Sequence, residues 1–244
     1  MKCSSPCKVI TSLTLFLALI AAIPAFSQTN SNSVSNRVVN VPDPARFKSE
    51  IQAFLTSDVT NAPEKDKVLF VGSSTIRLWK TVGKDMAPLP VYNRGFGGAT
   101  TYDILYYLDK IVIPYAPRVI VFYCGTNDFG PESHDENGVF ERTRKFFEIV
   151  RQKLPETKIV YISIVRCPFR KAYWSNMNAA NEMIRNYCAT HDDMAFVDVN
   201  PGVFDEKGEP KLEFYQKDKL HFNEAGYRQI SSVIRPVVTA AFRK

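Results

Sequence analysis

The pair Asp218 and His221 is the strongest candidate for acid–base chemistry in the sequence. A carboxylate three residues before an imidazole can accept a hydrogen bond from one ring nitrogen and leave the other free to act as a base. The alternative is a chance pair in an exposed loop. His134, in a polar loop, and His191, at a helix end, are weaker candidates, and neither has metal-ligand spacing with another histidine or cysteine. No resident metal is therefore expected.

Ser74 is a candidate nucleophile, because an adjacent imidazole base can activate a serine hydroxyl. It lies in the small-residue turn Gly72-Ser73-Ser74-Thr75, directly after an apolar run. Taken alone, this segment favours the alternative that the serine caps a helix, since serine is strongly preferred at helix N-termini. Only its surroundings can decide between the two roles.

Two further segments offer hydrogen-bond donors. The segment from Asn93 to Thr100 contains three glycines, which let backbone N–H groups approach a ligand or simply form a tight turn. A dinucleotide-binding fingerprint is excluded, because the sixth position counted from Gly95 is Thr100 and not glycine. The segment Cys124-Gly125-Thr126-Asn127-Asp128 carries a carboxamide with two N–H donors. Asn127 could instead bond to the backbone of its own turn.

The elements that must position these residues alternate between strand and helix. Short apolar runs predict five strands, and segments of helical period separate or follow them, after a first helix with Pro44 at its first position. Such alternation predicts a parallel sheet covered by helices on both faces, a three-layer α/β/α sandwich. The catalytic candidates would then meet at the carboxyl ends of the strands. The predicted strands are 68–71, 90–92, 119–123, 159–165 and 195–199, and the later helices are 102–113, 140–154, 177–188 and 225–241.

From about Val68 to Asn223 the sequence resembles the SGNH (GDSL-type) hydrolase superfamily, whose four blocks appear here in order. The resemblance implies a flavodoxin-like SGNH fold and an esterase that needs no cofactor. Ser74, His221 and Asp218 would be catalytic, and Ser74, Gly98 and Asn127 would form the oxyanion hole. The first block departs from Gly-Asp-Ser-Leu in having Ser73 and Thr75. This form is similar to a branch that includes platelet-activating-factor acetylhydrolase-like proteins and carbohydrate esterases.

The resemblance implies hydrolysis of a small acyl ester, with an acetyl group on a carbohydrate as the first expectation. Trp79 and Trp174 are candidate substrate contacts, with core packing as the alternative. A lysophospholipid acyl hydrolase or an acyltransferase would use the same site. Outside this class, a flavodoxin-like protein could hold a phosphate at the turn containing Ser74, and a non-catalytic binder could retain the fold.

The first 27 residues are typical of a secretory signal peptide, with Lys2 and Lys8 before an apolar stretch and small residues preceding a predicted cleavage after Ser27. We expect export to the periplasm or the medium, a flexible leader at 28–42, a hydrolase domain at 43–244 and no stable membrane anchor after cleavage. Cleavage removes two lysines, which takes the formal charge from +6 to +4. This mildly basic balance does not indicate a nucleic-acid partner, so the expected partner is a small-molecule ester. The sequence leaves the oligomeric state open. The three remaining cysteines, Cys124, Cys167 and Cys188, are predicted to be buried thiols, with one disulfide and one free thiol as the alternative.

Overall fold

A parallel sheet of five strands organises the computed structural model, which describes Met1 and residues 43–131, 133 and 135–243. The strands follow the order β2-β1-β3-β4-β5, and every neighbouring pair is parallel. The predicted signal peptide and leader lie outside the described residues. The strands are β1 (Val68–Gly72), β2 (Val91–Gly95), β3 (Val119–Tyr123), β4 (Lys158–Ile162) and β5 (Met194–Val197).

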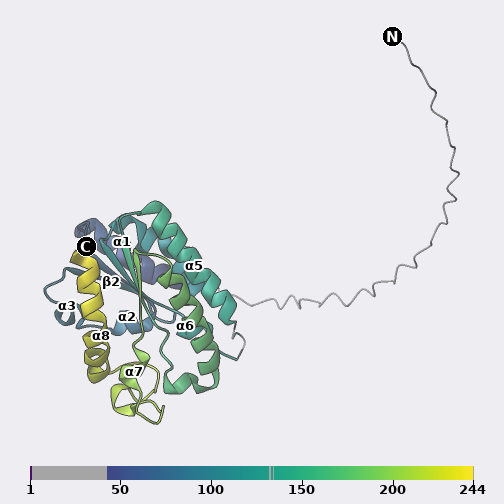
Figure 1. The fold of residues 1–244 in the computed structure, drawn as a ribbon. Helices are drawn as coiled ribbons and strands as arrows, with labels where there is room; N and C mark the ends of the chain where they lie inside the picture. The colour runs from purple at the N-terminus through teal and green to yellow at the C-terminus, as the bar shows by residue number, and fades with distance from the viewer. Residues whose placement is uncertain (2–42, 132, 134, 244) are drawn as a thin grey trace. The chain divides into compact units, whose positions relative to one another are not determined.

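Helices cover both faces of this sheet, as the alternation of elements predicts (Figure 1). One buried cluster packs β1, β3 and β4 against α1 (Lys48–Thr60), α4 (Thr101–Ile111), α5 (Glu136–Lys153) and α6 (Trp174–Ala189). The other packs the opposite face against α2 (Ser74–Leu78), α3 (Val82–Asp85), α7 (Asn200–Val203) and α8 (Glu224–Arg243). Short 3-10 helices complete the described elements: η1 (Pro44–Phe47), η2 (Ile113–Tyr115), η3 (Thr126–Asp128), η4 (Pro168–Tyr173) and η5 (Leu212–Phe214).

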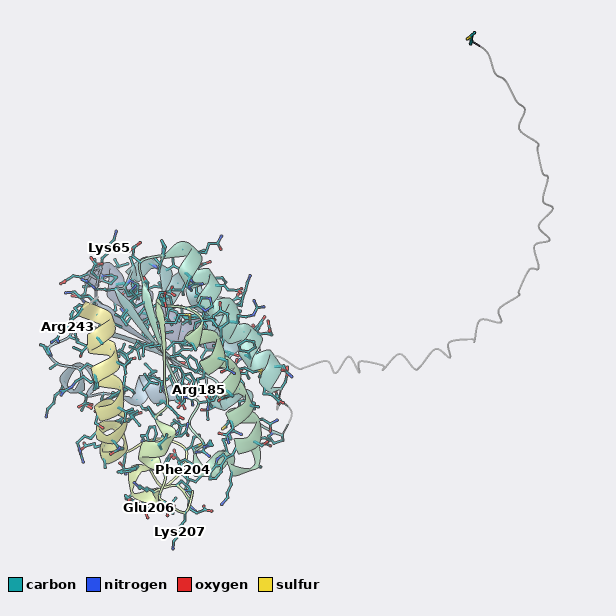
Figure 2. All side chains as sticks on the ribbon, in the orientation of Figure 1. Lys65, Arg185, Phe204, Glu206, Lys207 and Arg243 are labelled. Carbon is teal, nitrogen blue, oxygen red and sulfur yellow. The ribbon has the colours of Figure 1, made fainter. Side chains whose placement is uncertain are left out.

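The strand order reverses at β1, which lies between β2 and β3. Chain segments that leave the carboxyl ends of β1 and β3 therefore run to opposite faces, and parallel sheets of this kind bind ligands at such a point. Lys65, just before β1, and Glu206, after β5, lie at opposite ends of the molecule, so the amino and carboxyl edges of the sheet can be told apart (Figure 2). The carboxyl edge is where the sequence places its catalytic candidates.

The predicted strand pattern is confirmed, with differences at the ends of strands. Residues 119–123 form β3 without change, but the predicted strand 159–165 ends early, at Ile162. Beyond it, the Asn181 side chain bonds both to the backbone N–H and to the carbonyl of Ile164, at 2.7 and 2.9 Å. A side chain thus replaces the neighbouring strand there, an exchange that hydrophobic pattern does not reveal. No helix in the described part of the chain is both long and apolar enough to cross a membrane.

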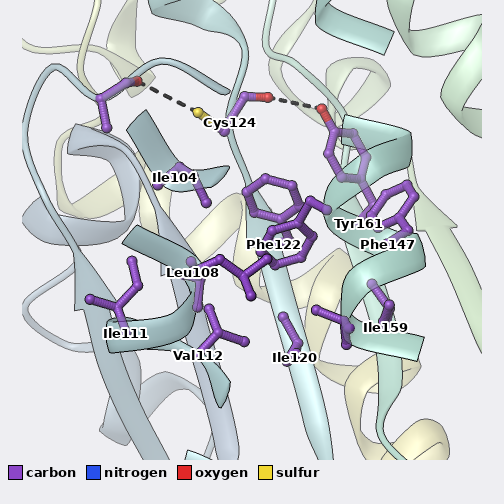
Figure 3. Close-up of a cluster of buried hydrophobic side chains, with 14 of the residues drawn as sticks. Ile104, Leu108, Ile111, Val112, Ile120, Phe122, Cys124, Phe147, Ile159 and Tyr161 are labelled. Atoms are coloured by element: carbon purple, nitrogen blue, oxygen red, sulfur yellow. Dashed lines mark hydrogen bonds between the residues drawn. The ribbon is translucent and has the colours of Figure 1, made fainter. Parts of the chain in front are cut away.

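The core on the α5 side is rich in aromatic rings (Figure 3). Phe122 on β3 stacks on Phe146 at 4.2 Å between ring centroids and meets Tyr161 edge-on at 5.6 Å. Cys124 lies beside this cluster, where its Sγ donates to the Ala99 carbonyl and its own carbonyl accepts from Tyr161 (Figure 3). The predicted buried thiols are confirmed for Cys124, Cys167 and Cys188, which are all free and buried.

Phe122→Ala should lower the free energy of unfolding by about 3–5 kcal/mol, because it removes a fully buried ring from between aromatic neighbours that cannot collapse into the space. Chemical denaturation measures the loss. The matched control is Leu212→Ala, which truncates a side chain that is 54% exposed and should change stability by less than about 0.5 kcal/mol. Similar losses of unfolding free energy in Phe122→Ala and Leu212→Ala would contradict the packing of Phe122 in the core.

Candidate active site

Three side chains from two distant loops form one hydrogen-bonded chain. His221 Nε2 lies 2.9 Å from Ser74 Oγ, although 147 residues separate the two in sequence. His221 Nδ1 lies 2.6 Å from Asp218 Oδ2. With Nδ1 protonated towards the carboxylate, Nε2 is free to accept the serine proton. The arrangement is that of a nucleophile, a base and a residue that orients the base.

The loop that carries the base is held by the same carboxylate. Asp218 Oδ1 accepts hydrogen bonds from the backbone N–H groups of Leu220, at 2.9 Å, and His221, at 3.0 Å. Lys219 adopts a left-handed conformation with φ of 56°, which closes this tight turn. Desolvation raises the pKa of Asp218, but the backbone N–H and ring of His221 and the N–H of Leu220 outweigh it, so the net pKa is lowered. Asp218 therefore stays ionised and oriented towards the imidazole.

Gly72 sets the position of Ser74 at the end of β1. Its φ is 154°, and a Cβ there would come within 1.9 Å of the Tyr123 carbonyl on β3, so no other residue fits. Ser73 is the N-cap of α2 but makes no side-chain cap bond, and Ser74 is the first helical residue. The helix-cap alternative for Ser74 is wrong, because its hydroxyl contacts His221 instead. Its backbone N–H, at the first position of the helix, has no intrahelical acceptor.

A hydrogen bond joins the loop of Gly98 to the turn of Asn127. Gly98 has a φ of 79°, which favours glycine, and it precedes Ala99 in the loop after β2. Asn127 Nδ2 donates to the Ala99 carbonyl at 3.0 Å, so the amide does not close its own turn, as the alternative required. One amide N–H of Asn127 remains for another acceptor. Donors on the β2 and β3 loops are thereby brought to the same edge as Ser74.

An ion pair that the sequence does not predict fastens these two loops together. Asp128, buried beside Asn127, accepts from the Thr101 hydroxyl at 2.5 Å and from the Thr101 backbone N–H at 3.0 Å. Arg142 on α5 reaches both residues, with Nε 2.7 Å from Thr101 Oγ1 and Nη2 3.3 Å from Asp128 Oδ1. Burial raises the pKa of Asp128, and Arg142 and Thr101 oppose that rise. The group fixes the spacing between the loops of Gly98 and Asn127.

A second set of hydrogen bonds joins the segment Asn93–Thr100, which contains three glycines, to α2. Asn93 Nδ2 donates to the Ile76 carbonyl at 2.7 Å, and Asn93 Oδ1 accepts from the Gly95 N–H at 2.9 Å. A helix cap at the end of the same segment also supports it. The sequence indicates this cap, because Thr100 and Asp103 have the spacing of a capping box, and the two residues form one at the start of α4. Nothing in the sequence pairs Arg142 with Asp128, since the two meet only through the packing of α5.

The structure corrects the prediction that Trp79 contacts substrate. Trp79 is fully buried, stacked on Tyr227 at 5.3 Å, and its indole N–H donates to Asp85 at 2.7 Å. The ring has no exposed surface for a ligand because it fills the core beneath α8. Trp174 is half-buried and donates to the Cys167 carbonyl at 2.9 Å, which fixes the loop after β4.

The other histidines do not join this site within the described residues. His191 bonds to the Tyr187 carbonyl at 2.8 Å and stacks on the Tyr187 ring, a structural role at the end of α6. His134 lies outside the described residues. Nowhere in 43–131, 133 and 135–243 do three or more histidine, cysteine or acidic side chains gather as metal ligands would.

A family model for the GDSL-like lipase/acylhydrolase family matches residues 71–229, which contain every residue of the hydrogen-bonded chain and both donor loops. The chain belongs to this family. Among curated relatives, this GDSL-like acylhydrolase is 22% identical over 219 residues to the platelet-activating factor acetylhydrolase IB subunit alpha2 of Gallus gallus, covering 86% of this chain and 91% of the relative.

Solved structures share the fold of this GDSL-like acylhydrolase. A GDSL-like lipase from Bacteroides thetaiotaomicron superposes with a TM-score of 0.63 at 22% identity, covering 82% of this chain and 98% of the other. A carbohydrate esterase of family 3 from Talaromyces cellulolyticus gives a TM-score of 0.58 at 16% identity, covering 73% and 98%. Together with the family match, they identify a carboxylic ester hydrolase rather than the flavodoxin-like ligand-binding protein considered as an alternative.

Arg142→Met should destabilise the protein by about 3 kcal/mol near neutral pH, because it leaves the Asp128 carboxylate buried without its cation. The loss of Arg142 raises the already elevated pKa of Asp128 further. A folded-state pKa above the unfolded value favours the folded state at low pH, and this advantage disappears as pH rises through the folded pKa. The variant should therefore differ less from the wild type at pH 4 than at pH 7.

Urea denaturation at both pH values measures this difference. The exposed pair Arg228 and Glu224 supplies the control, since Arg228→Met breaks a surface ion pair and should cost less than about 1 kcal/mol at either pH. A pH-independent loss in Arg142→Met would contradict the role assigned to the carboxylate.

Proposed function

We propose that this esterase works through an acyl-enzyme formed on Ser74, with His221 as general base and Asp218 as the residue that orients the imidazole. The single observation that carries the proposal is the unbroken hydrogen-bond chain from Ser74 Oγ through both ring nitrogens of His221 to Asp218. No other residue within hydrogen-bond distance of Ser74 Oγ in the described chain could remove its proton. The stabilising donors would be the backbone N–H groups of Ser74 and Gly98 and the side-chain amide of Asn127.

Each proton in this mechanism has a stated destination. Ser74 Oγ attacks the ester carbonyl as its proton moves to His221 Nε2, and the carbonyl oxygen becomes an oxyanion held by the three donors. His221 then returns the proton to the alcohol oxygen as the ester C–O bond breaks, which leaves the acyl group on Ser74. Water attacks the acyl-enzyme while His221 accepts its proton, and the acid leaves as Ser74 regains its hydrogen.

The proposed substrate is an acetyl ester of a carbohydrate. The named activity of the curated relative supports a small acyl group, since that protein is an acetylhydrolase. The carbohydrate esterase among the structural neighbours supports a sugar alcohol. Phe169, which is 60% exposed on the loop bonded to the Asp218–His221 turn, offers an aromatic face of the kind on which sugars stack.

We also propose that the protein is exported and acts outside the cytoplasm, on the strength of the signal-like segment at residues 1–27. Mass spectrometry of the native protein tests this proposal. A mature N-terminus at Gln28 is the expected result, and an intact N-terminus in the cell fraction would contradict it.

Ser74→Ala should abolish turnover of 4-nitrophenyl acetate and labelling by a fluorophosphonate, because no other group can form the acyl-enzyme. Ser73→Ala is the matched control: its side chain is buried, makes no cap bond and lies next to the nucleophile, so labelling should persist. Labelling of a folded Ser74→Ala protein would overturn the assignment.

Asn127→Ala should lower kcat by about 10²–10³, the usual effect of losing one donor to the oxyanion, with a smaller change in KM. Steady-state kinetics on the same ester measures both constants. Asn127→Ala also removes the bond from Nδ2 to the Ala99 carbonyl, so urea denaturation of the variant measures the structural part of the change separately from the loss of kcat. Near-normal kcat in Asn127→Ala would remove Asn127 from the oxyanion hole.

A further inference from the structure

An arginine that pairs with no described carboxylate lies beside the proposed site. Arg170, in η4, is half-buried, and its Nε is fully shielded from solvent with no hydrogen-bond acceptor. Across the part of the chain that the structure describes, no carboxylate forms an ion pair with Arg170, whereas Arg94 and Arg142 pair with Asp58 and Asp128. Because Nε is shielded, an anion from outside would bind through the Nη groups of this guanidinium, for which the described residues supply no carboxylate.

Contacts on both sides place Arg170 between two loops of the site. The backbone N–H of its neighbour Phe169 donates at 3.0 Å to the carbonyl of Lys219, which lies between Asp218 and His221. On the other side, a Cβ built on Gly130 would lie 3.5 Å from Arg170 Nη1, and Gly130 follows Asn127 by three residues. The guanidinium therefore lies at the carboxyl edge, between the loop of the base and the loop of Asn127.

A second guanidinium on the same loop adds positive potential. Arg166 also has a shielded Nε without an acceptor, and its guanidinium lies 4.3 Å from the ring centroid of Phe204, which is found at the α7 end of the molecule (Figure 2). The nearby acids are already occupied: Asp218 is bonded to His221, and Glu209 is paired with Lys171. The loop itself, residues 163–173, carries two arginines and one lysine and no carboxylate, so its net charge is positive.

We propose that Arg170 binds an oxyanion, a carboxylate or a phosphate, carried by the alcohol part of the substrate, so that the enzyme acts on acyl esters of acidic alcohols. This inference rests on the proposed function. His221 must protonate the departing alcohol oxygen, so the alcohol part lies on the His221 side, where the Phe169–Lys219 bond anchors the loop of Arg170. The planar guanidinium can meet a carboxylate or phosphate through two parallel hydrogen bonds, which selects for anions.

The test compares acetyl esters that differ only in charge. One pair is an acetylated methyl glucuronoside and its neutral carboxyl methyl ester, and a second pair is an acetylated glucoside with and without a 6-phosphate. In the wild type, kcat/KM should be at least about tenfold higher for the charged member of one pair, the range of a charge-assisted hydrogen bond. The pair that shows this preference identifies the anion as carboxylate or phosphate.

Variants then locate the preference. Arg170→Gln should bring the charged-to-neutral ratio of kcat/KM close to one, and Arg170→Lys should retain part of it, because the charge remains while the paired geometry is lost. Arg235→Gln is the matched control, since it removes the same charge from an exposed position on α8 and should keep the wild-type ratio. The ratio is internal to each variant and does not depend on how much protein is active.

The outcomes are distinguishable. Equal turnover of charged and neutral esters by the wild type would overturn this inference and leave the esterase intact, as would a wild-type ratio in Arg170→Gln. A preference removed by Arg77→Gln instead would also overturn it, because that guanidinium lies over Gly97, in the loop after β2 and not on the loop of Arg170. Turnover of no ester in any pair, with no labelling of Ser74, would overturn the proposed function and this inference with it.

Discussion

The hydrogen bond between His221 Nε2 and Ser74 Oγ is the contact on which the site depends. It joins the first strand–helix turn of the sheet to the loop before the last helix, so it exists only when the whole domain between them is folded. The fold restricts the conformations of the segments that carry Ser74 and His221. Gly72 brings β1 close to β3 next to Ser74, and the carboxylate of Asp218 closes the turn that carries His221. Function in this chain is therefore tied to the integrity of the sheet rather than to one local motif.

Support for the site comes from a buried polar group as well as from packing. Asp128, Thr101 and Arg142 hold the loop of Gly98 against the turn of Asn127 through five hydrogen bonds between charged or polar atoms. Burying the Asp128 carboxylate carries a desolvation penalty, which an apolar contact between the two loops would avoid. Its advantage is direction, because hydrogen bonds fix both the spacing and the orientation of the loops that carry Gly98 and Asn127.

Charge divides the surroundings of the site into two kinds of arginine. Arg94 and Arg142 are satisfied by aspartates from distant elements and strengthen the fold. Arg166 and Arg170 lie on the loop after β4 next to aromatic rings, and among the described residues their shielded Nε atoms have no acceptor. Arginine thus stabilises the fold where a described aspartate pairs with it, and the proposed anion site uses an arginine that no described acid neutralises.

The sequence by itself determined the order of elements and the five strands, because each lies in a local pattern of apolar runs and turns. It singled out Ser74, Gly98, Asn127, Asp218 and His221 as candidates through their resemblance to the four blocks of the SGNH superfamily. Only the tertiary structure decided what each of them contacts. It brought Ser74 to His221, turned Asn127 towards Ala99 and buried Trp79, which the sequence assigned to substrate. The sequence did not predict the role of Arg142 or Arg170 for the same reason. Whether each arginine meets an acid depends on elements that pack together from distant parts of the chain.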